Sequence, residues 1–205
     1  AALRYIHSMG VVHRDVKLEN WVFASPAQER LKLIDFGLAT TTVVAEVGKE
    51  VDDAAPLANR KLTRTCGTAY YVAPEVICVM DDGRFCEGEG YGKEVDIWAL
   101  GVLLYMLVSG AAPFDGRSPA HVLQRISNLP FSDDYLCKAF QGRRWRNTSP
   151  QCKNLISRCL ERNPHKRITA AGVQRHPWLL EHTKASSTTS MSLQAFLKDV
   201  SFAGF

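Results

Sequence analysis

Apolar residues along the chain recur at two spacings, one typical of helices and one typical of short strands. The first ten residues place Leu3, Ile6 and His7 on one helical face, and Gly10 supplies a stop signal. Further helical patterns span about 95–110, 118–127, 149–161 and 169–181. The pattern at 95–110 is apolar on almost every side, which predicts a buried central helix closed by Gly110.

Short apolar runs at 21–24 and 31–35 predict a small β-hairpin, because a turn rich in Ser, Pro and Gln separates them. The stretch 38–72 is long and loop-like, and such a loop in a compact domain is usually functional or partly disordered. Three helix starts are predicted from proline or a capping residue, at Pro119, Pro150 and Thr169. These patterns together predict a mostly helical domain with one or two small hairpins, and they do not name a function.

Composition excludes several classes of protein. The 205 residues are 46% hydrophobic and 22% charged, as in an ordinary soluble globular domain. The net charge of +4 comes largely from "RRWR" at 143–146 and "HKR" at 165–167, which is too small and too local for nucleic-acid binding. We interpret "RRWR" as a solvated helix start with Trp145 packed inward. No signal peptide and no apolar run of the ~20 residues needed to span a bilayer is present, so a cytoplasmic or nuclear location is expected.

The cysteines show no metal-binding spacing. None of them forms a CxxC pair, so we expect reduced and mostly buried thiols. Cys152 and Cys159 lie seven residues apart and are expected on one helix face.

The stretch "HRDVKLEN" at 13–20 carries the candidate chemistry. Asp15 lies five residues before Asn20, and Asp35 ends the second predicted strand. If the hairpin folds back, Asn20 and Asp35 meet at its open end, where their oxygens would suit Mg²⁺. Lys17 would bring a positive charge to the same point, and Asp15 would remain able to accept a proton. These are the parts that phosphoryl transfer requires, although a capped polar turn would use the same residue types.

The same residues belong to a larger ordered set of motifs. H-R-D-x-x-x-x-N at 13–20, D-F-G at 35–37 and A-P-E at 73–75 form the signature set of eukaryotic protein kinases, which this sequence resembles. "CGTAYYVAPE", "DIWALG", "NPHKRIT" and "HPW" also look like the later kinase motifs. The resemblance covers residues 1 to about 180. It implies a protein kinase-like α+β fold: a mostly α-helical C-terminal lobe with small β-hairpins, the N-terminal lobe being absent.

The resemblance assigns roles to individual residues. Asp15 is similar to the catalytic base, and Lys17 to the lysine that neutralises the γ-phosphate of ATP in Ser/Thr kinases. Asn20 and Asp35 resemble the Mg²⁺ ligands. Thr68 resembles the threonine that touches the catalytic aspartate and helps to select the hydroxyl acceptor.

Other matched residues have structural roles in the family. Glu75 and Arg167 resemble a buried ion pair that ties the activation segment to the C-terminal lobe. Asp96 resembles the helix residue that anchors the backbone of the catalytic loop, and Arg14 the arginine that a charge on the activation loop positions. Trp21 stands where the family has a smaller aliphatic residue under the adenine.

The sequence also departs from the family pattern. A Gly-rich loop, a strand lysine and its helix glutamate partner are missing, so we expect a fragment that does not catalyse by itself. Arg64 stands where many related kinases carry the activating phosphosite, so that site is Thr63, Thr65 or none.

Details of the motifs most resemble the calcium/calmodulin-dependent protein kinase group, with calcium-dependent protein kinases the nearest type. Residues 181–205 are predicted to form a linker and a short amphipathic segment, 193–202. This segment lies where an autoinhibitory or junction segment would contact calmodulin or a calcium-sensing domain, and a packing helix is the alternative. The chain contains no EF-hand loop.

Two functions remain at this point. The first is a Ser/Thr protein kinase that transfers the γ-phosphate of ATP to protein substrates with Mg²⁺. The alternative is a non-catalytic kinase-like lobe that binds proteins. The sequence leaves open the substrate, its consensus site, calcium regulation and the oligomeric state.

Overall fold

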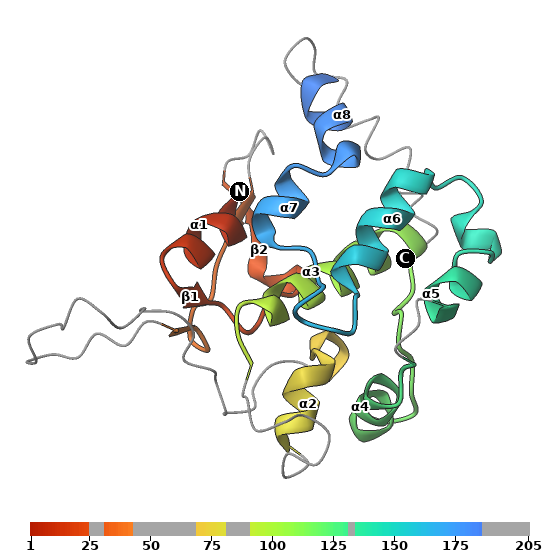
Figure 1. Cartoon of the computed structure of the whole chain (residues 1–205), viewed down its shortest axis with the longest axis horizontal. Coiled ribbons are helices and arrows are strands. Elements are labelled where there is room, and N and C mark those ends of the chain that lie inside the picture. Colours follow the sequence, from red (N-terminus) through yellow and green to blue (C-terminus); the bar gives the residue numbers. More distant parts are fainter. Residues whose placement is uncertain (25–30, 43–68, 81–90, 131–133, 186–205) are drawn as a thin grey trace, which may run out of the picture.

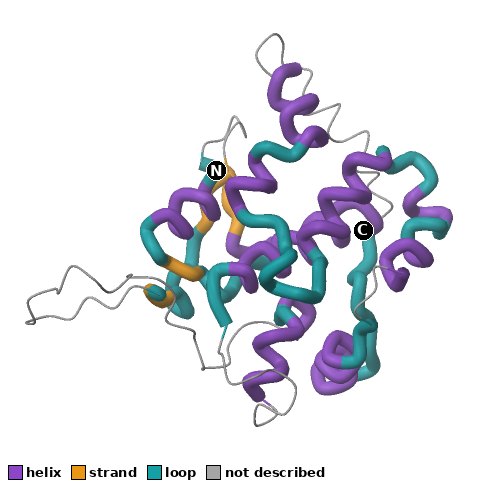
Figure 2. The backbone as a smooth tube through the Cα atoms, viewed as in Figure 1, coloured by secondary structure: helices purple, strands orange, loops and turns teal. Residues whose placement is uncertain are grey.

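The computed structural model describes residues 1–24, 31–42, 69–80, 91–130 and 134–185, and helices form most of its regular structure (Figure 2). The other helices surround one long helix, α3 (Glu94–Ser109), which lies at the centre of the molecule (Figure 1). Residues of α3 such as Ile97, Trp98 and Val102 are almost completely buried. The prediction of a buried central helix is therefore confirmed, and Gly110 ends it in the left-handed conformation with φ 65°.

Helix α3 packs closely against α6 (Pro150–Cys159). The close approach depends on Gly101, where a Cβ atom would lie 2.7 Å from the Cβ of Cys159 and 2.9 Å from Cδ2 of Leu160. A larger residue at 101 would push the two helices apart, because core side chains leave no room for it.

Three helices begin where the sequence predicts. They are α4 (Pro119–Ser127), α6 and α7 (Ala170–Gln174). The hydroxyls of Ser118, Ser149 and Thr169 accept hydrogen bonds from backbone N–H groups three residues further on, at 3.2, 3.2 and 3.1 Å. Each cap satisfies a donor that has no partner inside the helix.

The predicted hairpin is confirmed. Strands β2 (Trp21–Phe23) and β3 (Leu31–Leu33) are antiparallel, with Trp21 opposite Leu33. A second two-stranded sheet pairs β1 (Val11–Val12) with β4 (Thr40–Thr41). This pair encloses the hairpin in sequence, so both strand pairs lie next to the segment 13–20.

The remaining helices and turns were predicted only in part. The predicted helix 169–181 is wrong as one element: α7 and α8 (Pro177–Ala185) are separate, because Pro177 has no N–H with which to continue the preceding helix. Helix α1 is confirmed, η3 lies at the helix start expected at 143–146, and α2, α5 and the other two described 3₁₀ turns were not predicted. Their bounds are α1 (Ala2–Ser8), α2 (Pro74–Met80), α5 (Asp134–Ala139), η1 (Leu18–Asn20), η2 (Ala69–Tyr71) and η3 (Arg143–Trp145). The predicted segment 193–202 lies outside the described residues, and α8 extends into the predicted linker.

Aromatic rings fill the space around α3. Trp98 stacks on Phe114 with ring centroids 5.5 Å apart. Trp145 meets Tyr105 at 4.7 Å and Phe140 at 4.6 Å, so the inward packing predicted for Trp145 is confirmed. The arginines on either side of Trp145 are exposed, as the "RRWR" interpretation expected.

The cysteine prediction holds for two residues and fails for one. Cys152 and Cys159 are buried, and burial raises the pKa of the Cys159 thiol to about 12. Cys137 is exposed and lies on α5, a helix that was not predicted. The side chains of Cys66, Cys78 and Cys86 lie outside the described residues.

Within the part that the structure describes, none of the helices combines the length and the hydrophobicity needed to cross a bilayer.

Candidate active site

Three of the predicted site residues form one hydrogen-bonded cluster on the loop between β1 and β2. The carboxylate of Asp15 is largely buried, and its Oδ2 accepts a hydrogen bond from Nζ of Lys17 at 2.6 Å. Nδ2 of Asn20 donates to the same Oδ2 at 3.1 Å and to the Asp15 carbonyl at 2.8 Å. The 3₁₀ turn η1 makes this possible, because it brings Asn20 back toward Asp15.

The backbone of this loop is held from below by α3. Asp96 is 1% exposed, and its carboxylate accepts hydrogen bonds from the backbone N–H groups of His13 at 2.9 Å and Arg14 at 2.8 Å. Its Oδ2 also lies 2.8 Å from Nε2 of His7, on α1. The expectation that Asp96 anchors the loop is thus confirmed, and the anchor fixes the backbone immediately before Asp15.

His13 ties the same loop to the end of β3. Its Nδ1 accepts a hydrogen bond from the Asp15 N–H at 3.3 Å, and its Nε2 lies 3.1 Å from the Ile34 carbonyl. One neutral tautomer, protonated on Nε2, satisfies both contacts. The ring also meets Phe36 edge-on at 4.8 Å, so His13 packs between the loop and the segment that carries Asp35.

Asp35 lies at the open end of the hairpin, as predicted. The Ile34 N–H donates to the Asn20 carbonyl at 2.9 Å, which continues the β2–β3 pairing to the residue before Asp35. Asp35 has φ 62°, a conformation that is uncommon for a residue with a side chain. Its Oδ1 accepts from the Gly37 N–H at 3.2 Å, and a Cβ at position 37 would lie only 3.1 Å from that oxygen. Gly37 therefore leaves room for the Asp35 carboxylate.

The oxygens of Asn20 and Asp35 fit a hard cation such as Mg²⁺. Both N–H donations of Asn20 go to Asp15, which leaves its Oδ1 without a partner among the described residues. Asp35 likewise has Oδ2 available beyond its contact with Gly37. The described residues contain no cluster of three or more His, Cys, Asp or Glu side chains suited to a metal. Mg²⁺ commonly binds through one or two protein groups and completes its shell with water and phosphate oxygens.

Electrostatics around Lys17 keep it positively charged. The hydrogen bond that Lys17 donates to Asp15 raises the pKa of Lys17, and the charges of Asp15, Glu19 and Asp35 act in the same direction. Lys17 is therefore positively charged at neutral pH and lies beside the carboxylate of Asp15.

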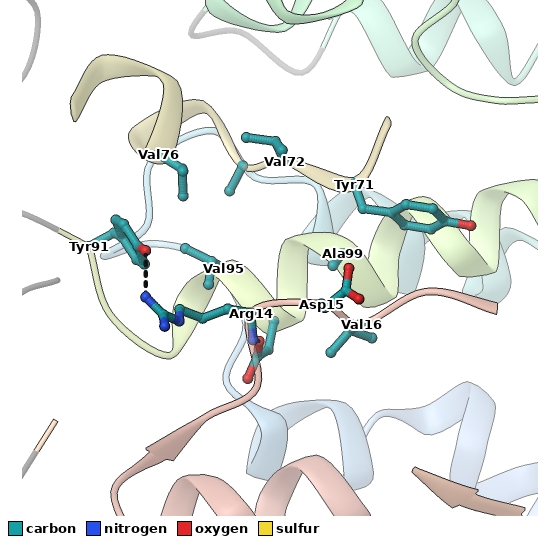
Figure 3. A pocket seen from close by; sticks show the side chains of 11 residues that line it. Arg14, Asp15, Val16, Tyr71, Val72, Val76, Tyr91, Val95 and Ala99 are labelled. Atoms are coloured by element: carbon teal, nitrogen blue, oxygen red, sulfur yellow. Dashed lines mark hydrogen bonds between the residues drawn. The ribbon is translucent and has the colours of Figure 1, made fainter. Parts of the chain in front are cut away.

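Asp15 also lines a small pocket between its loop and the α2 region (Figure 3). Its walls come from the loop at 13–20, from α2 with the preceding residues and from the start of α3. Tyr71 and Tyr91 line it, and burial raises the pKa of Tyr71. Both tyrosines were missed from the sequence. Tyr71 lies inside the motif that ends in A-P-E, whereas no pattern marked Tyr91.

The predicted ion pair between Glu75 and Arg167 is present. Nη1 and Nη2 of Arg167 donate to the two carboxylate oxygens of Glu75, at 2.6 and 2.9 Å. The guanidinium also lies over the ring of Trp98, 5.1 Å from its centroid. This pair joins α2 to the chain that precedes α7.

Some expectations fall on residues outside the described part. Thr68, the predicted contact of Asp15, lies there, as do Thr63 and Thr65. Trp21, in contrast, lies within the described part. Its indole Nε1 is buried without a hydrogen-bond partner there, and the ring packs against the core. Val22, next to it, is the more exposed of the two residues.

Comparison with known proteins shows the family of the chain. Residues 1–179 match the family described as "Protein kinase domain", so the chain belongs to the protein kinase family. It is 36% identical over 180 residues to a calcium/calmodulin-dependent protein kinase, cmkB, of Emericella nidulans, covering 87% of this chain and 38% of that protein.

Two further relatives belong to the same group of kinases. A calcium/calmodulin-dependent protein kinase type I of Schizosaccharomyces pombe is 35% identical over 188 residues, covering 91% of this chain and 48% of the relative. Calcium-dependent protein kinase 25 of Arabidopsis thaliana is 35% identical over 185 residues, covering 89% and 29%. The chain thus spans less than half the length of each of these relatives.

Proposed function

We propose that this chain carries the catalytic loop of a Ser/Thr protein kinase, which transfers the γ-phosphate of ATP to Ser or Thr hydroxyls of protein substrates. One observation carries the proposal: Asp15, Lys17 and Asn20 share a hydrogen-bonded cluster on a backbone that Asp96 holds. A loop that served only as a polar turn would have no need for a buried carboxylate beneath it. The described helices correspond in this proposal to the C-terminal lobe.

Each residue has a role in the transfer. Asp15 accepts the proton of the substrate hydroxyl as that oxygen attacks phosphorus, and the cluster holds its carboxylate in place. Lys17, kept cationic by its neighbours, stabilises the negative charge of the transferred phosphate. Asn20 and Asp35 would hold Mg²⁺, which when bound neutralises charge on the phosphates of ATP. Thr68 would contact Asp15 and favour a hydroxyl acceptor.

Regulation by calcium is part of the proposal. The similar proteins are named for dependence on calcium or calmodulin. We place the regulatory contact in residues 193–202, through calmodulin or a calcium-sensing domain.

A second candidate, a kinase-like protein-binding module, rests on exposed apolar side chains. Phe23 and Leu31 on the β2–β3 hairpin are 52% and 51% exposed, and Phe36 beside Asp35 is 45% exposed. Such a patch favours burial against another protein surface, either a further lobe of the same protein or a partner.

The deciding experiment is a phosphate-transfer assay on the full-length gene product that contains residues 1–205. Radiolabelled Mg-ATP and a mixture of Ser/Thr peptides are supplied, and transfer is compared for the wild type, Asp15→Asn and the exposed control Asp115→Asn. We expect Asp15→Asn to lower kcat by about 10²–10⁴-fold, the usual contribution of a positioned acid or base. The control is expected to retain activity, and residues 1–205 alone are expected to be inactive.

The results separate the two candidates. An Asp15→Asn protein as active as the wild type would reject Asp15 as the base. A wild type that neither transfers phosphate nor binds Mg-ATP, yet captures a protein partner through the hairpin, would favour the binding module.

A further inference from the structure

Arg14 adopts a backbone conformation that needs support. It has φ 66°, in the left-handed region that residues with side chains seldom adopt, and it lies directly before Asp15. Such a conformation is unfavourable and persists only where its surroundings hold it. Asp96 supplies part of this support by accepting the Arg14 N–H.

The side chain of Arg14 connects two segments that are distant in sequence. Its Nε–H donates to the Leu38 carbonyl at 2.7 Å, just after Asp35-Phe36-Gly37. Its Nη1 donates to the hydroxyl of Tyr91 at 3.3 Å, a contact drawn in Figure 3. None of the ion pairs among the described residues includes Arg14, so its two recorded acceptors are neutral oxygens.

Tyr91 is well placed to hold this guanidinium still. It is 2% exposed and belongs to the hydrophobic core, three residues before α3 begins. The packed ring fixes the position of the hydroxyl, which faces Arg14 at the edge of the pocket that Asp15 also lines (Figure 3). A hydrogen bond to a charged group is stronger than one between neutral groups.

We propose that Tyr91 is a positioning residue for the phosphate transfer, a role that rests on the proposed kinase function. Its hydroxyl holds the guanidinium of Arg14, which in turn joins the segment after Asp35 to the backbone that presents Asp15. Tyr91 touches neither ATP nor the acceptor. Its loss lowers the rate of the transfer step and leaves the affinity for ATP nearly unchanged, because the ATP-facing groups keep their places.

The test removes only the hydroxyl. In the full-length protein, Tyr91→Phe is compared with Tyr105→Phe, which also removes a buried hydroxyl but lies on the far part of α3 beside Trp145. We expect Tyr91→Phe to lower kcat roughly tenfold with the KM for ATP unchanged within about twofold. Tyr105→Phe is expected to leave kcat within about twofold. A Tyr91→Phe protein with unchanged kcat, or one in which only KM changes, would overturn the proposal.

A double-mutant cycle tests whether Tyr91 acts through Arg14. Arg14→Lys keeps the charge but cannot reach both acceptors, so we expect it to reproduce the loss of kcat. Adding Tyr91→Phe to Arg14→Lys should then lower kcat little further. If the two residues acted independently, the two losses of kcat would multiply. Arg14→Lys also serves as the test should Tyr91→Phe fail to fold, since full activity in Arg14→Lys would equally reject the link.

Hydrogen exchange separates this inference from the kinase proposal itself. The backbone amides of 13–17 should exchange faster in Tyr91→Phe than in the wild type or Tyr105→Phe, whether or not the protein transfers phosphate. If exchange rises but the wild type shows no transfer, the kinase proposal fails and the positioning contact stands. If the wild type is active and the exchange of these amides is unchanged, only the positioning role is rejected.

Discussion

Two buried charges meet the first turn of α3, Asp96 as part of the helix and Arg167 as a contact of Glu94, and the structure uses them differently. Asp96 is surrounded by donors from the loop at 13–20 and from α1, two of which are backbone N–H groups. Arg167 is paired with the carboxylate of Glu75 and also donates to the carbonyls of Glu161 and Glu94. The first charge positions a loop, whereas the second joins α2 to the chain that follows α6.

The comparison shows that burial alone does not decide what a charge contributes. A buried carboxylate that accepts several N–H donors holds local backbone, so its loss should be felt first in that backbone. A buried ion pair contributes little net stability as a pair, but removing one partner leaves an uncompensated charge in the core. The predictions below test this distinction.

The largest effect is expected when Glu75 is removed. Glu75→Leu leaves the Arg167 guanidinium buried and unpaired, so we expect the free energy of unfolding to fall by about 3–5 kcal/mol. Adding Arg167→Met should recover part of this loss, because the unpaired charge is removed with it. Urea unfolding of the two variants measures the difference, with exposed Lys166→Met as the control. A double variant less stable than Glu75→Leu would show that Arg167 stabilises the fold without its partner.

A smaller and more local effect is expected at Asp96. Asp96→Asn replaces one acceptor by an NH₂ group that faces a backbone donor, which should cost about 1–3 kcal/mol. Exchange of the His13 and Arg14 amides should accelerate more than that of the core amides, measured by mass spectrometry. Glu75→Leu should raise exchange throughout the fold instead. If both variants accelerated the same amides, the two buried charges would not differ in the way proposed.

Much of the fold and site could be predicted because the decisive signals are local. The caps at Ser149 and Thr169 and the hairpin turn act within a few residues, and the hairpin alone places Asn20 beside the segment of Asp35. The cluster of Asp15 with Asn20 also needs only the short turn η1.

The parts that could not be predicted depend on distant contacts or on very short elements. Strands β1 and β4 have two residues each, too few for an alternating pattern. The contact between Arg14 and Tyr91 spans 77 positions, and no local pattern marks either partner for the other. The anchor at Asp96 was expected only through resemblance to kinases, since a carboxylate in an apolar helix has many uses.

The smallest effect on stability is expected at His176, because it is a buried polar group that carries no charge at neutral pH. It lies between α7 and α8, where its Nδ1 accepts from the Trp178 N–H at 3.3 Å and its Nε2 faces Oδ1 of Asn154 at 3.0 Å. Burial, with a contribution from Arg158, lowers the pKa of His176 below the ordinary 6.5 of an unfolded chain. Unlike Asp96 and Arg167, this group should matter only where it would gain a charge.

The sign of the pH effect follows from the lowered pKa. Below about pH 6.5 the unfolded chain takes up a proton at His176 before the folded protein does, so acid favours unfolding. The stability that the neutral ring contributes is present above this pH and is lost as the pH falls toward the lower folded pKa. Urea midpoints at pH 7.5 and 5.0 should therefore differ less in His176→Gln than in the wild type, while exposed His165→Gln should keep the full difference. An unchanged difference in His176→Gln would mean that another group causes the acid sensitivity.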